Sequence, residues 1–453
     1  MKNKSVLTDM TKGPIAPQIL NFTLPLIIGN FCVLAYNAAD AIIVGYYAGE
    51  DALAALGAAT PIMNMMLFLM IGICLGMSIL TGIYFGSGEI EKLKREISTA
   101  LIGGSIFTII LVLLGYFLSE NILLLMGTPQ EILHESTYFL QVIFIGLIFS
   151  FIYNIYAALL RSMGSSLPSL YFLIISAIIN VVLDLIFVKY LHLGLKGAAW
   201  GTVIAEFCAA LFCVIYSYIK VPLLRLGLKD LIFDWSLFKL TVHYSSVSAM
   251  QQLTLQIGKF LVQGAINPLG IPAIAAFNAV NRVDDFIFVV QQNIAHGTTG
   301  FMAQNKGARQ IKRMRNGFKS GLIMVLIYTF FASITVFSFA PQIIHAFVGN
   351  EADSVKELGI DYLKIMAIIY VLPAITNIFQ GYFRGIGKLN ITLNATFVQI
   401  IFRVIAAYVL ATNYSVTGMA WACLVGWVFM LLYELPLFIK FWKNPRKSII
   451  QSV

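Results

Sequence analysis

Two aspartates, Asp40 and Asp184, stand inside long apolar stretches of the sequence. An ionised carboxylate at the centre of a lipid bilayer costs about 2.5–3.5 kcal/mol on insertion scales, so such residues face a partner or a water-filled cavity. Asn180 precedes Asp184 by four residues and shares one face of a helix with it. The sequence therefore predicts a buried polar site that includes both acids.

Thr202 adds a hydroxyl to this site, because it lies in the second turn of the next expected helix. Oxygen ligands of these kinds suit a hard cation such as Na⁺. Two close carboxylates can instead share a proton, since they resist being ionised together. A third interpretation is that these side chains only form hydrogen bonds between packed helices. We favour an ion-coupling site at Asp40, Asn180, Asp184 and Thr202, and leave Na⁺ and H⁺ open.

The elements that would position these residues are membrane-spanning helices. Hydrophobic residues make up 59% of the 453 positions and charged residues only 11%, with a mean hydropathy of +0.86. The apolar blocks have the length that a helix needs to cross a bilayer. We predict an all-α membrane protein with twelve spans, at about 18–46, 52–84, 96–118, 134–160, 168–188, 197–219, 240–266, 272–302, 317–340, 357–383, 391–412 and 417–440.

The net charge of +9 arises from short basic clusters between the apolar blocks, such as Lys92 to Arg95 and Lys312 to Arg315. Cytoplasmic loops are typically basic. We therefore place both termini in the cytoplasm of a bacterial cell, with the chain in the inner (cytoplasmic) membrane, and expect no binding to nucleic acid. The sequence also lacks a G-x-x-x-x-G-K-[ST] phosphate loop, so we expect the energy for transport to come from an ion gradient or a partner. We expect no enzymatic activity and no cofactor other than Na⁺ or H⁺ as the coupling ion.

The chain repeats itself with a period of about 220 residues. Arg-Ser-Met-Gly at 161–164 returns as Arg-Gly-Ile-Gly at 384–387, and Gly-Ala-Ala-Trp at 197–200 returns as Gly-Met-Ala-Trp at 418–421. Repeats of six spans have the same orientation in the membrane. We predict two pseudo-symmetric six-helix lobes, residues 1–219 and 240–453, joined by a cytoplasmic linker at 220–239, with substrate bound between the lobes.

These motifs resemble those of the multidrug and toxic compound extrusion (MATE) transporters over essentially the whole chain. The resemblance rests on Asn-Ala-Ala-Asp at 37–40, Asn-Val-Val-Leu-Asp at 180–184, Gly-Ala-Ala-Trp-Gly-Thr at 197–202 and Ala-Gln-Asn-Lys-Gly-Ala at 303–308. It implies an antiporter that exports organic, often cationic, compounds in exchange for Na⁺ or H⁺. It also implies that Asp40, Asn180, Asp184 and Thr202 form the cation site of the first lobe, and that Pro25 is a bend coupled to Asp40.

The second lobe departs from the sodium-dependent branch of that family, in which acidic residues of helices 7 and 10 are implicated. Gln251, Gln252 and Gln256 stand in helix 7 here, and Thr376, Asn377 and Gln380 stand in helix 10. Lys259, Arg282, Asp284 and Asp285 are the charged residues of this region, and we expect them to pair internally. The candidates for the substrate cavity are Tyr36, Asn37, Asn154, Gln252, Lys259 and Asp284.

A flippase or exporter of a lipid-linked precursor or a dedicated metabolite is the alternative function, because Lys259 and Arg282 could face an anionic group. Twelve spans and two acids in the first lobe oppose it. The expected partners are therefore lipophilic organic cations or other small molecules and the lipid bilayer, and the expected oligomeric state is a monomer.

The topology predicts which loops face outward. Single cysteines at Asn267 and Asn350 should react with a membrane-impermeant thiol reagent added outside the cell, whereas cysteines at Asn305 and Asn390 should not, because only the first pair follows an outward-running span. Labelling in a cysteine-free background measures this. The reverse pattern would contradict the charge-based orientation.

Overall fold

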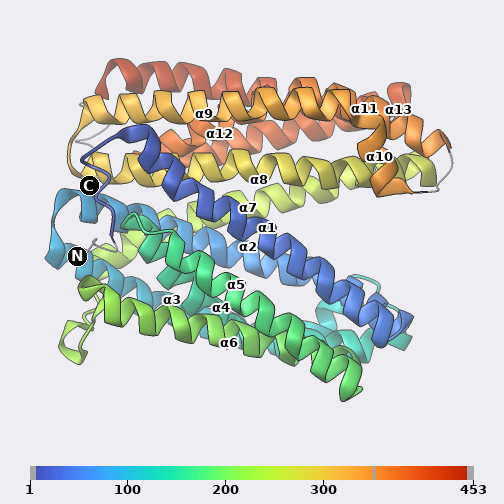
Figure 1. Ribbon diagram of the computed structural model, residues 1–453, viewed down its shortest axis with the longest axis horizontal. Helices are drawn as coiled ribbons and strands as arrows, with labels where there is room; N and C mark the ends of the chain where they lie inside the picture. The colour runs from blue at the N-terminus through green and yellow to red at the C-terminus, as the bar shows by residue number, and fades with distance from the viewer. Residues whose placement is uncertain (1–6, 350–352, 446–453) are drawn as a thin grey trace. The chain divides into compact units, whose positions relative to one another are not determined.

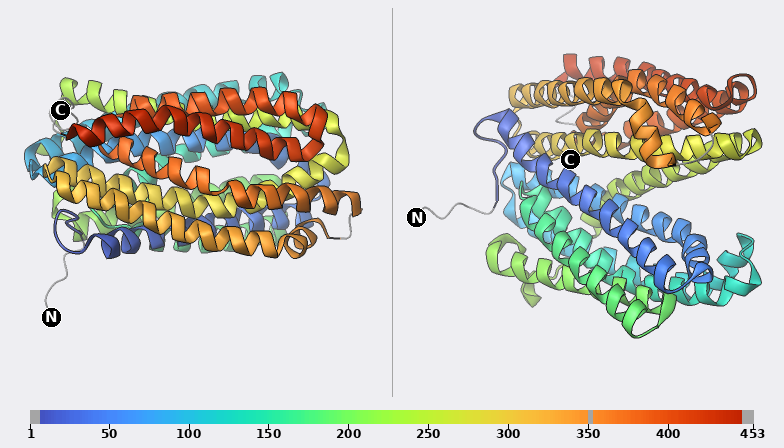
Figure 2. Two further views of the ribbon diagram at one scale, coloured as in Figure 1. Left: turned by 90° about the horizontal axis from the view of Figure 1, so that it is seen from above. Right: turned by 45° about the vertical axis from the view of Figure 1, so that its right-hand side comes forward.

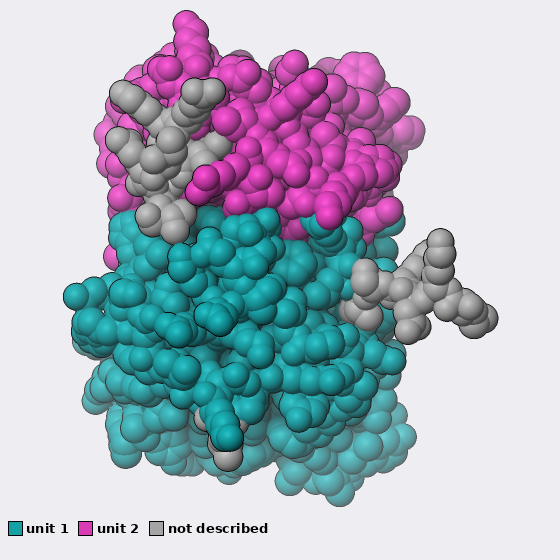
Figure 3. All heavy atoms as spheres, turned by 90° about the vertical axis from the view of Figure 1, so that its left-hand side faces the viewer, with its two compact units in different colours: residues 1–9, 24–249 teal, residues 10–23, 250–453 magenta. Residues whose placement is uncertain are grey.

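The computed structural model describes residues 7–349 and 353–445, and within these ranges it contains helices but no strands. Two compact units are present: unit 1 consists of residues 1–9 and 24–249, and unit 2 of residues 10–23 and 250–453 (Figure 3). Each unit therefore contains most of one sequence repeat, together with the beginning of a helix from the other repeat.

Unit 1 is built around α4, which packs against α2, α3 and α6, while α5 packs against α6 (Figure 1). The helices of the first repeat are α1 (Ile15–Tyr47), α2 (Glu50–Ser87), α3 (Ile90–Leu125), α4 (Gln130–Ser162), α5 (Leu167–Asp184), the π-helical turn η1 (Leu185–Tyr190) and α6 (Gly194–Lys220). Two short 3₁₀ turns, η2 (Pro222–Leu224) and η3 (Leu228–Asp230), lie in the predicted linker.

Unit 2 is built around α8, which packs against α9, α11 and α12, so that long helices run alongside one another through the unit (Figure 2). The second repeat consists of α7 (Trp235–Ile266), η4 (Asn267–Leu269), α8 (Ile271–Gly307), α9 (Ile311–Ser338), α10 (Ala340–Val348), α11 (Asp353–Ile369), α12 (Val371–Gly385) and α13 (Leu389–Lys443).

The twelve predicted spans each coincide with helix. Eight helices in the described ranges are long and apolar enough to cross a membrane, and the pair α11 and α12, bent by 45°, forms a ninth span. The 55 residues of α13 contain two spans that meet at Ser415, where φ is +52°. The more polar helices α7 and α8, of 32 and 37 residues, complete the set. The predicted all-α fold with twelve spans is confirmed.

The repeated Arg-x-x-Gly motif ends a helix in each repeat. Gly164 has φ +82° and its N–H bonds to the carbonyl of Arg161, while Gly387 has φ +75° and bonds in the same way to Arg384. A residue with a Cβ is strained in this left-handed conformation, which explains why glycine closes both helices. The two motifs are therefore structurally equivalent C-caps of α4 and α12.

The linker ends in a cap for α7. The Asp234 carboxylate accepts hydrogen bonds from the backbone N–H of Ser236 (2.9 Å) and Leu237 (3.2 Å) and from the Ser236 hydroxyl (2.7 Å). These donors favour the ionised form, and the hydroxyl of Ser236 contributes most to lowering the pKa of Asp234. An acidic N-cap stabilises the first turn of a helix.

Two helices are shared between the units. The chain passes from unit 2 to unit 1 between Thr23 and Leu24 of α1, directly before Pro25, and in the opposite direction between Ala249 and Met250 of α7. The helix α1 continues through Pro25 without interruption. The start of α1 therefore belongs to unit 2 and the start of α7 to unit 1.

The Gln-Asn-Lys-Gly motif of α8 holds the segment before α1 within unit 2. Gln304 accepts a hydrogen bond from the Met10 N–H (2.9 Å), and Asn305 donates one to the Met10 carbonyl (3.1 Å). Arg313 donates to the carbonyls of Met10 (3.0 Å) and Gly13 (2.7 Å). This motif thus has a structural role that its sequence alone does not reveal.

The structure also qualifies the labelling positions. Asn267 and Asn390 are exposed, but Asn305 is buried against Met10 and Asn350 lies outside the described residues. Asn267 and Asn390 are therefore the informative pair for the topology test.

Glycines of α2 allow α7 to approach closely within unit 1. A Cβ on Gly76 would come within 2.5 Å of the Cα of Ser245, whereas a Cβ on Gly57 of the same helix would meet nothing within 4 Å. Gly76→Ala should lower the thermal stability of the purified protein, because overpacking costs about 1–3 kcal/mol. Gly57→Ala, the control, should raise or preserve it, since alanine is favoured over glycine in a helix by about 0.5–1 kcal/mol. Equal melting temperatures of the two variants would contradict the close contact.

Candidate ion-coupling site

The first-lobe acids approach one another inside unit 1. Asp184 is the last residue of α5 before the π-helical turn η1, and its side chain is fully buried. Asp40 of α1 faces it, with the two carboxyl groups close enough to share a proton. π-Helical turns are frequent at functional sites because they reorient side chains locally. The structure therefore brings together two acids that are 144 positions apart in the chain.

The amide and the hydroxyl join the acids. Asn180, which is 4% exposed, donates to the Thr202 hydroxyl at 3.5 Å, and Thr202 donates to the Ala198 carbonyl at 3.1 Å. Gly201 lies against a carboxylate oxygen of Asp184, where any Cβ would collide with it. All four predicted coupling residues therefore lie in one cluster formed by α1, α5 and α6.

Four oxygens of this cluster are buried without a hydrogen-bond partner in the described part of the chain. They are Asp40 Oδ1, both carboxylate oxygens of Asp184 and Asn180 Oδ1. Buried acceptors of this kind are costly unless a proton or a cation binds them. No group of three or more His, Cys, Asp or Glu side chains within residues 7–349 and 353–445 could hold a metal ion. Two carboxylates with neutral oxygens suit a monovalent cation or a proton.

Further polar residues extend the cluster. Tyr36 is close to both Asp40 and Glu206 of α6, and Glu206 faces Ser150 of α4. Asn154 donates to the Ser150 carbonyl at 2.9 Å. The remaining cavity candidate of this lobe, Asn37, is exposed on the surface of unit 1.

The second-lobe candidates do not form one cluster. Asp284 is 5% exposed and accepts a hydrogen bond from the Tyr370 hydroxyl at 2.5 Å. Lys259 pairs with Asp285 at 3.6 Å instead, and both side chains of this pair are more than half exposed. Arg282 is exposed and Gln252 is partly buried. Asp284 and Lys259 therefore have different environments.

A polar network near the end of α12 escaped the sequence analysis. Arg384 donates to the side-chain oxygens of Gln251 (3.2 Å) and Gln380 (3.0 Å), and Gln251 donates to Thr396 (2.9 Å). Glu434 of α13 faces this network and is fully buried. The sequence singled out Arg384 through the repeated Arg-x-x-Gly motif, and Gln251 and Gln380 as polar residues of two helices, but it did not indicate that these three residues meet or that Glu434 joins them.

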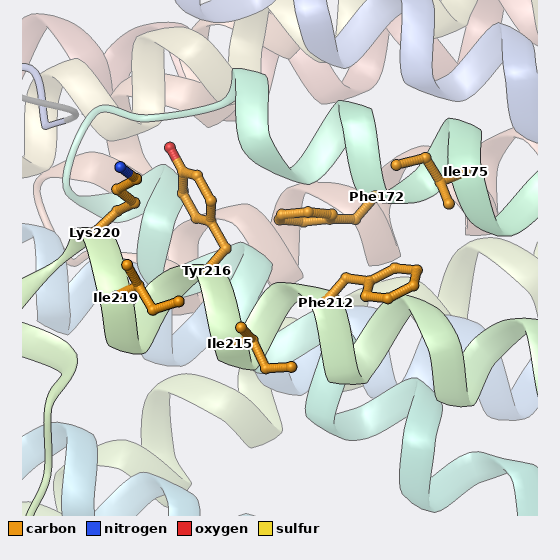
Figure 4. A pocket seen from close by; sticks show the side chains of 7 residues that line it. All are labelled: Phe172, Ile175, Phe212, Ile215, Tyr216, Ile219 and Lys220. Atoms are coloured by element: carbon orange, nitrogen blue, oxygen red, sulfur yellow. The ribbon is translucent and has the colours of Figure 1, made fainter.

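The outer surface of α5 and α6 contains an apolar groove of about 460 Å³. The side chains of Phe172 and Phe212 point into it, with the Tyr216 hydroxyl and the Lys220 ammonium group together at one end (Figure 4). No residue of the Asp40 and Asp184 cluster lines it. The groove is therefore separate from the candidate ion site.

The MatE family profile matches two stretches of equal length, residues 25–186 and 248–409. Together they cover most of the chain and coincide with its two repeats. The chain belongs to the MatE family. It is accordingly a multi-pass membrane transporter and not an enzyme, as predicted.

Relatives of this MatE protein are similar to it over most of their length. It is 28% identical over 342 residues to the probable multidrug resistance protein YoeA of Bacillus subtilis, covering 73% of each chain. It is 22% identical over 422 residues to the multidrug export protein MepA of Staphylococcus aureus (strain N315), covering 92% of this chain and 91% of MepA. A crystal structure of a MATE protein in the bent conformation superimposes with a TM-score of 0.91 at 21% identity, covering 99% of this chain and 100% of the other. The two-lobed MATE fold is thereby confirmed.

The Gly201 contact allows the cluster to be disturbed without removing any of its polar groups. Gly201→Ala should displace the flexible Asp184 carboxylate and strongly reduce ion-driven transport, while the melting temperature changes little, because a side-chain end can rotate away. Transport in proteoliposomes and thermal unfolding measure the two effects. Gly57→Ala is the control for both. Normal transport by Gly201→Ala would show that the position of the Asp184 carboxylate is unimportant.

Proposed function

We propose that this MatE protein exports small organic cations in exchange for an inward-moving Na⁺ or H⁺, which binds at Asp40, Asn180, Asp184 and Thr202. The observation that supports this most directly is the set of four buried oxygens of this cluster that lack partners in residues 7–349 and 353–445. The names of the relatives YoeA and MepA, a resistance protein and an export protein, support the same direction of transport.

The electrostatics of the cluster explain how an ion could drive a conformational change. With both acids ionised, two negative charges repel one another at short range in a poorly solvated site. A bound cation or proton removes this repulsion and so favours conformations in which α1 and α5 keep the acids together. An ion that binds one conformation better than another shifts the population by its difference in binding free energy.

The helix α1 is the element that would transmit this change. It contributes Asp40 to unit 1, yet its first residues belong to unit 2. Any change in the position of Asp40 must therefore be accommodated along α1, and Pro25 lies directly after the point where the helix changes unit. A proline leaves one carbonyl of a helix without its backbone partner, which permits bending.

We further propose that both termini lie in the cytoplasm and that the chain acts as a monomer in the bacterial cytoplasmic membrane. The asymmetry of basic residues between loops supports the orientation. The alternative, transport of a lipid-linked anion, relied on Lys259 and Arg282. Because Lys259 is paired with Asp285, it offers less uncompensated positive charge than the sequence suggested, so we favour the export of cations.

Removing either acid tests this proposal. Asp40→Asn keeps size and polarity but removes the charge, and it should abolish gradient-driven transport of a fluorescent organic cation in proteoliposomes. Expression should remain nearly normal, because removing a buried carboxylate also removes its desolvation cost. Asp184→Asn should behave in the same way. The double variant should be little worse than either single variant, as expected for residues that act as one unit.

The same vesicles distinguish the coupling ions when Na⁺ and pH gradients are imposed separately. Substrate binding without a gradient should survive at least partly in both variants, since ion coupling and substrate affinity are linked but separable. Normal rates with normal ion dependence in both single variants would place the coupling site elsewhere. No transport by the unaltered protein under either gradient, with a broad cation panel, would contradict the export proposal itself.

A further inference from the structure

Glu434 is a carboxylic acid buried in unit 2 that the first-lobe ion site does not use. Its side chain is 0% exposed, and its two oxygens make no close hydrogen bond in the described part of the chain, although the Gln380 side chain lies beside them. A fully buried carboxylate left ionised in this way would cost several kcal/mol, about 2–7 even for a neutral polar group. The same group is far less costly when it holds a proton. The environment of Glu434 therefore decides its protonation state.

Arg384 is the charged group that faces Glu434. Arg384 is 8% exposed, and its Nε also lacks a partner within residues 7–349 and 353–445, although its Nη2 donates to Gln251 and Gln380. An unpaired donor thus lies beside an unpaired acid, without a hydrogen bond between them. The structure shows the acid without a hydrogen bond to Arg384, an arrangement that favours a protonated acid, whereas an ionised acid would gain most from bonding to the guanidinium group.

Three other basic groups on the surrounding helices are engaged elsewhere. On α9, Arg315 donates to the Trp442 carbonyl at 2.6 Å, and on α8, Lys306 donates to the Ile386 carbonyl at 2.8 Å. Arg403, in the first part of α13, lies against Cys423. The charged residues of α11 precede Ile365, whereas Glu434 faces α12 near its end. Arg384 alone among these groups can neutralise Glu434 directly.

A metal cation fits this position poorly. Hard cations take several oxygen ligands, and the side-chain oxygens of Gln251 and Gln380 already accept hydrogen bonds from Arg384. Only the two oxygens of Glu434 remain, beside a positive charge that repels a metal ion. The proton is the one cation that needs no further ligand and can bind next to a guanidinium group.

The first repeat indicates that the acid is not required by the fold. The Gly-x-Ala-Trp motifs at 197–200 and 418–421 differ by 221 positions, and the same offset relates Glu434 to Cys213. Arg161, the equivalent of Arg384, faces the fully buried Cys213. The same architecture therefore forms around an arginine and a thiol in the first lobe, and the carboxylic acid is specific to the second.

We propose that Glu434 is a second proton-binding site, which is protonated when it stands apart from Arg384 and releases its proton when the two form an ion pair. This inference rests on the proposed ion-coupled transport and extends it, because the second lobe would then bind a proton in addition to the ion at Asp40 and Asp184. The proton leaves the carboxylic acid to water and the Glu434 carboxylate is then stabilised by the Arg384 guanidinium group.

Infrared difference spectroscopy of the purified protein in lipid, recorded between acidic and alkaline pH, tests this directly. The carbonyl band of a buried protonated carboxylic acid should be lost from both Glu434→Gln and Glu434→Cys, the second of which reproduces the thiol of the first lobe. Glu50→Gln, at the exposed start of α2, is the control and should retain the band. Identical spectra for the unaltered protein and both Glu434 variants would mean that Glu434 does not exchange a proton and would overturn the proposal.

Transport separates this inference from the proposed function. Glu434→Gln and Glu434→Cys should reduce transport driven by a pH gradient on the order of tenfold while substrate binding is retained. Losing a proton site weakens the coupling between proton and substrate more than it weakens the affinity for substrate. If the unaltered protein transports and both variants keep its rate and pH dependence, the inference fails and the proposed function stands. If the unaltered protein does not transport under any gradient, the proposed function fails, while the infrared result still decides whether Glu434 binds a proton.

Discussion

The free-energy cost of placing a charge in a poorly solvated interior governs where this protein keeps its acids. Each buried carboxyl group needs a donor, a cation or a proton to replace the water that it has lost. One oxygen of Glu96 in α3 accepts a hydrogen bond from the Thr241 hydroxyl at 2.7 Å, while its other oxygen has no partner in the described residues, and Asp284 accepts a hydrogen bond from the Tyr370 hydroxyl. Both carboxylate oxygens of Asp184 and of Glu434 make no close hydrogen bond within the described residues, although the Gln380 side chain lies beside Glu434. We base ion coupling on Asp184, with Asp40 beside it, and on Glu434, because Asp184 and Glu434 are acids with both oxygens left without a close donor in the described residues.

The two repeats share one helical architecture, but their buried acids stand on different helices. Both repeats end a helix with an arginine followed by a glycine in the left-handed region, and in both the arginine is turned into the protein. The first repeat places the acids of the candidate ion site on α1 and α5, whereas the second has Asp284 on α8 and Glu434 on α13. Because α12 and α13 pack together within unit 2, Glu434 meets Arg384 there, while its counterpart in the first lobe is a thiol.

The first residues of α1 and of α7 are held in place by hydrogen bonds and close packing. The first residues of α1 are fixed in unit 2 by Gln304, Asn305 and Arg313, and the first residues of α7 lie in unit 1 against Gly72 and Gly76. Main-chain carbonyls before α1 thereby gain the donors that they would lack in a membrane. Both α1 and α7 therefore have residues in each of the two units. Pro25 lies where α1 changes unit, which gives that helix a place to bend.

The sequence by itself determined the helical class, the twelve spans, the repeat and the family, because these depend on the length of apolar blocks and on motifs that can be read along the chain. It also identified Asp40, Asn180, Asp184 and Thr202, since polar residues are costly enough in a membrane helix to stand out. Tertiary structure alone decided which polar groups meet. Lys259 paired with Asp285 rather than with Asp284, and Glu434 reached Arg384 across 50 positions of the chain. A buried acid obtains its hydrogen-bond donors from other helices. The packing of the helices sets where those donors lie, and residue spacing along one helix gives no information about that packing.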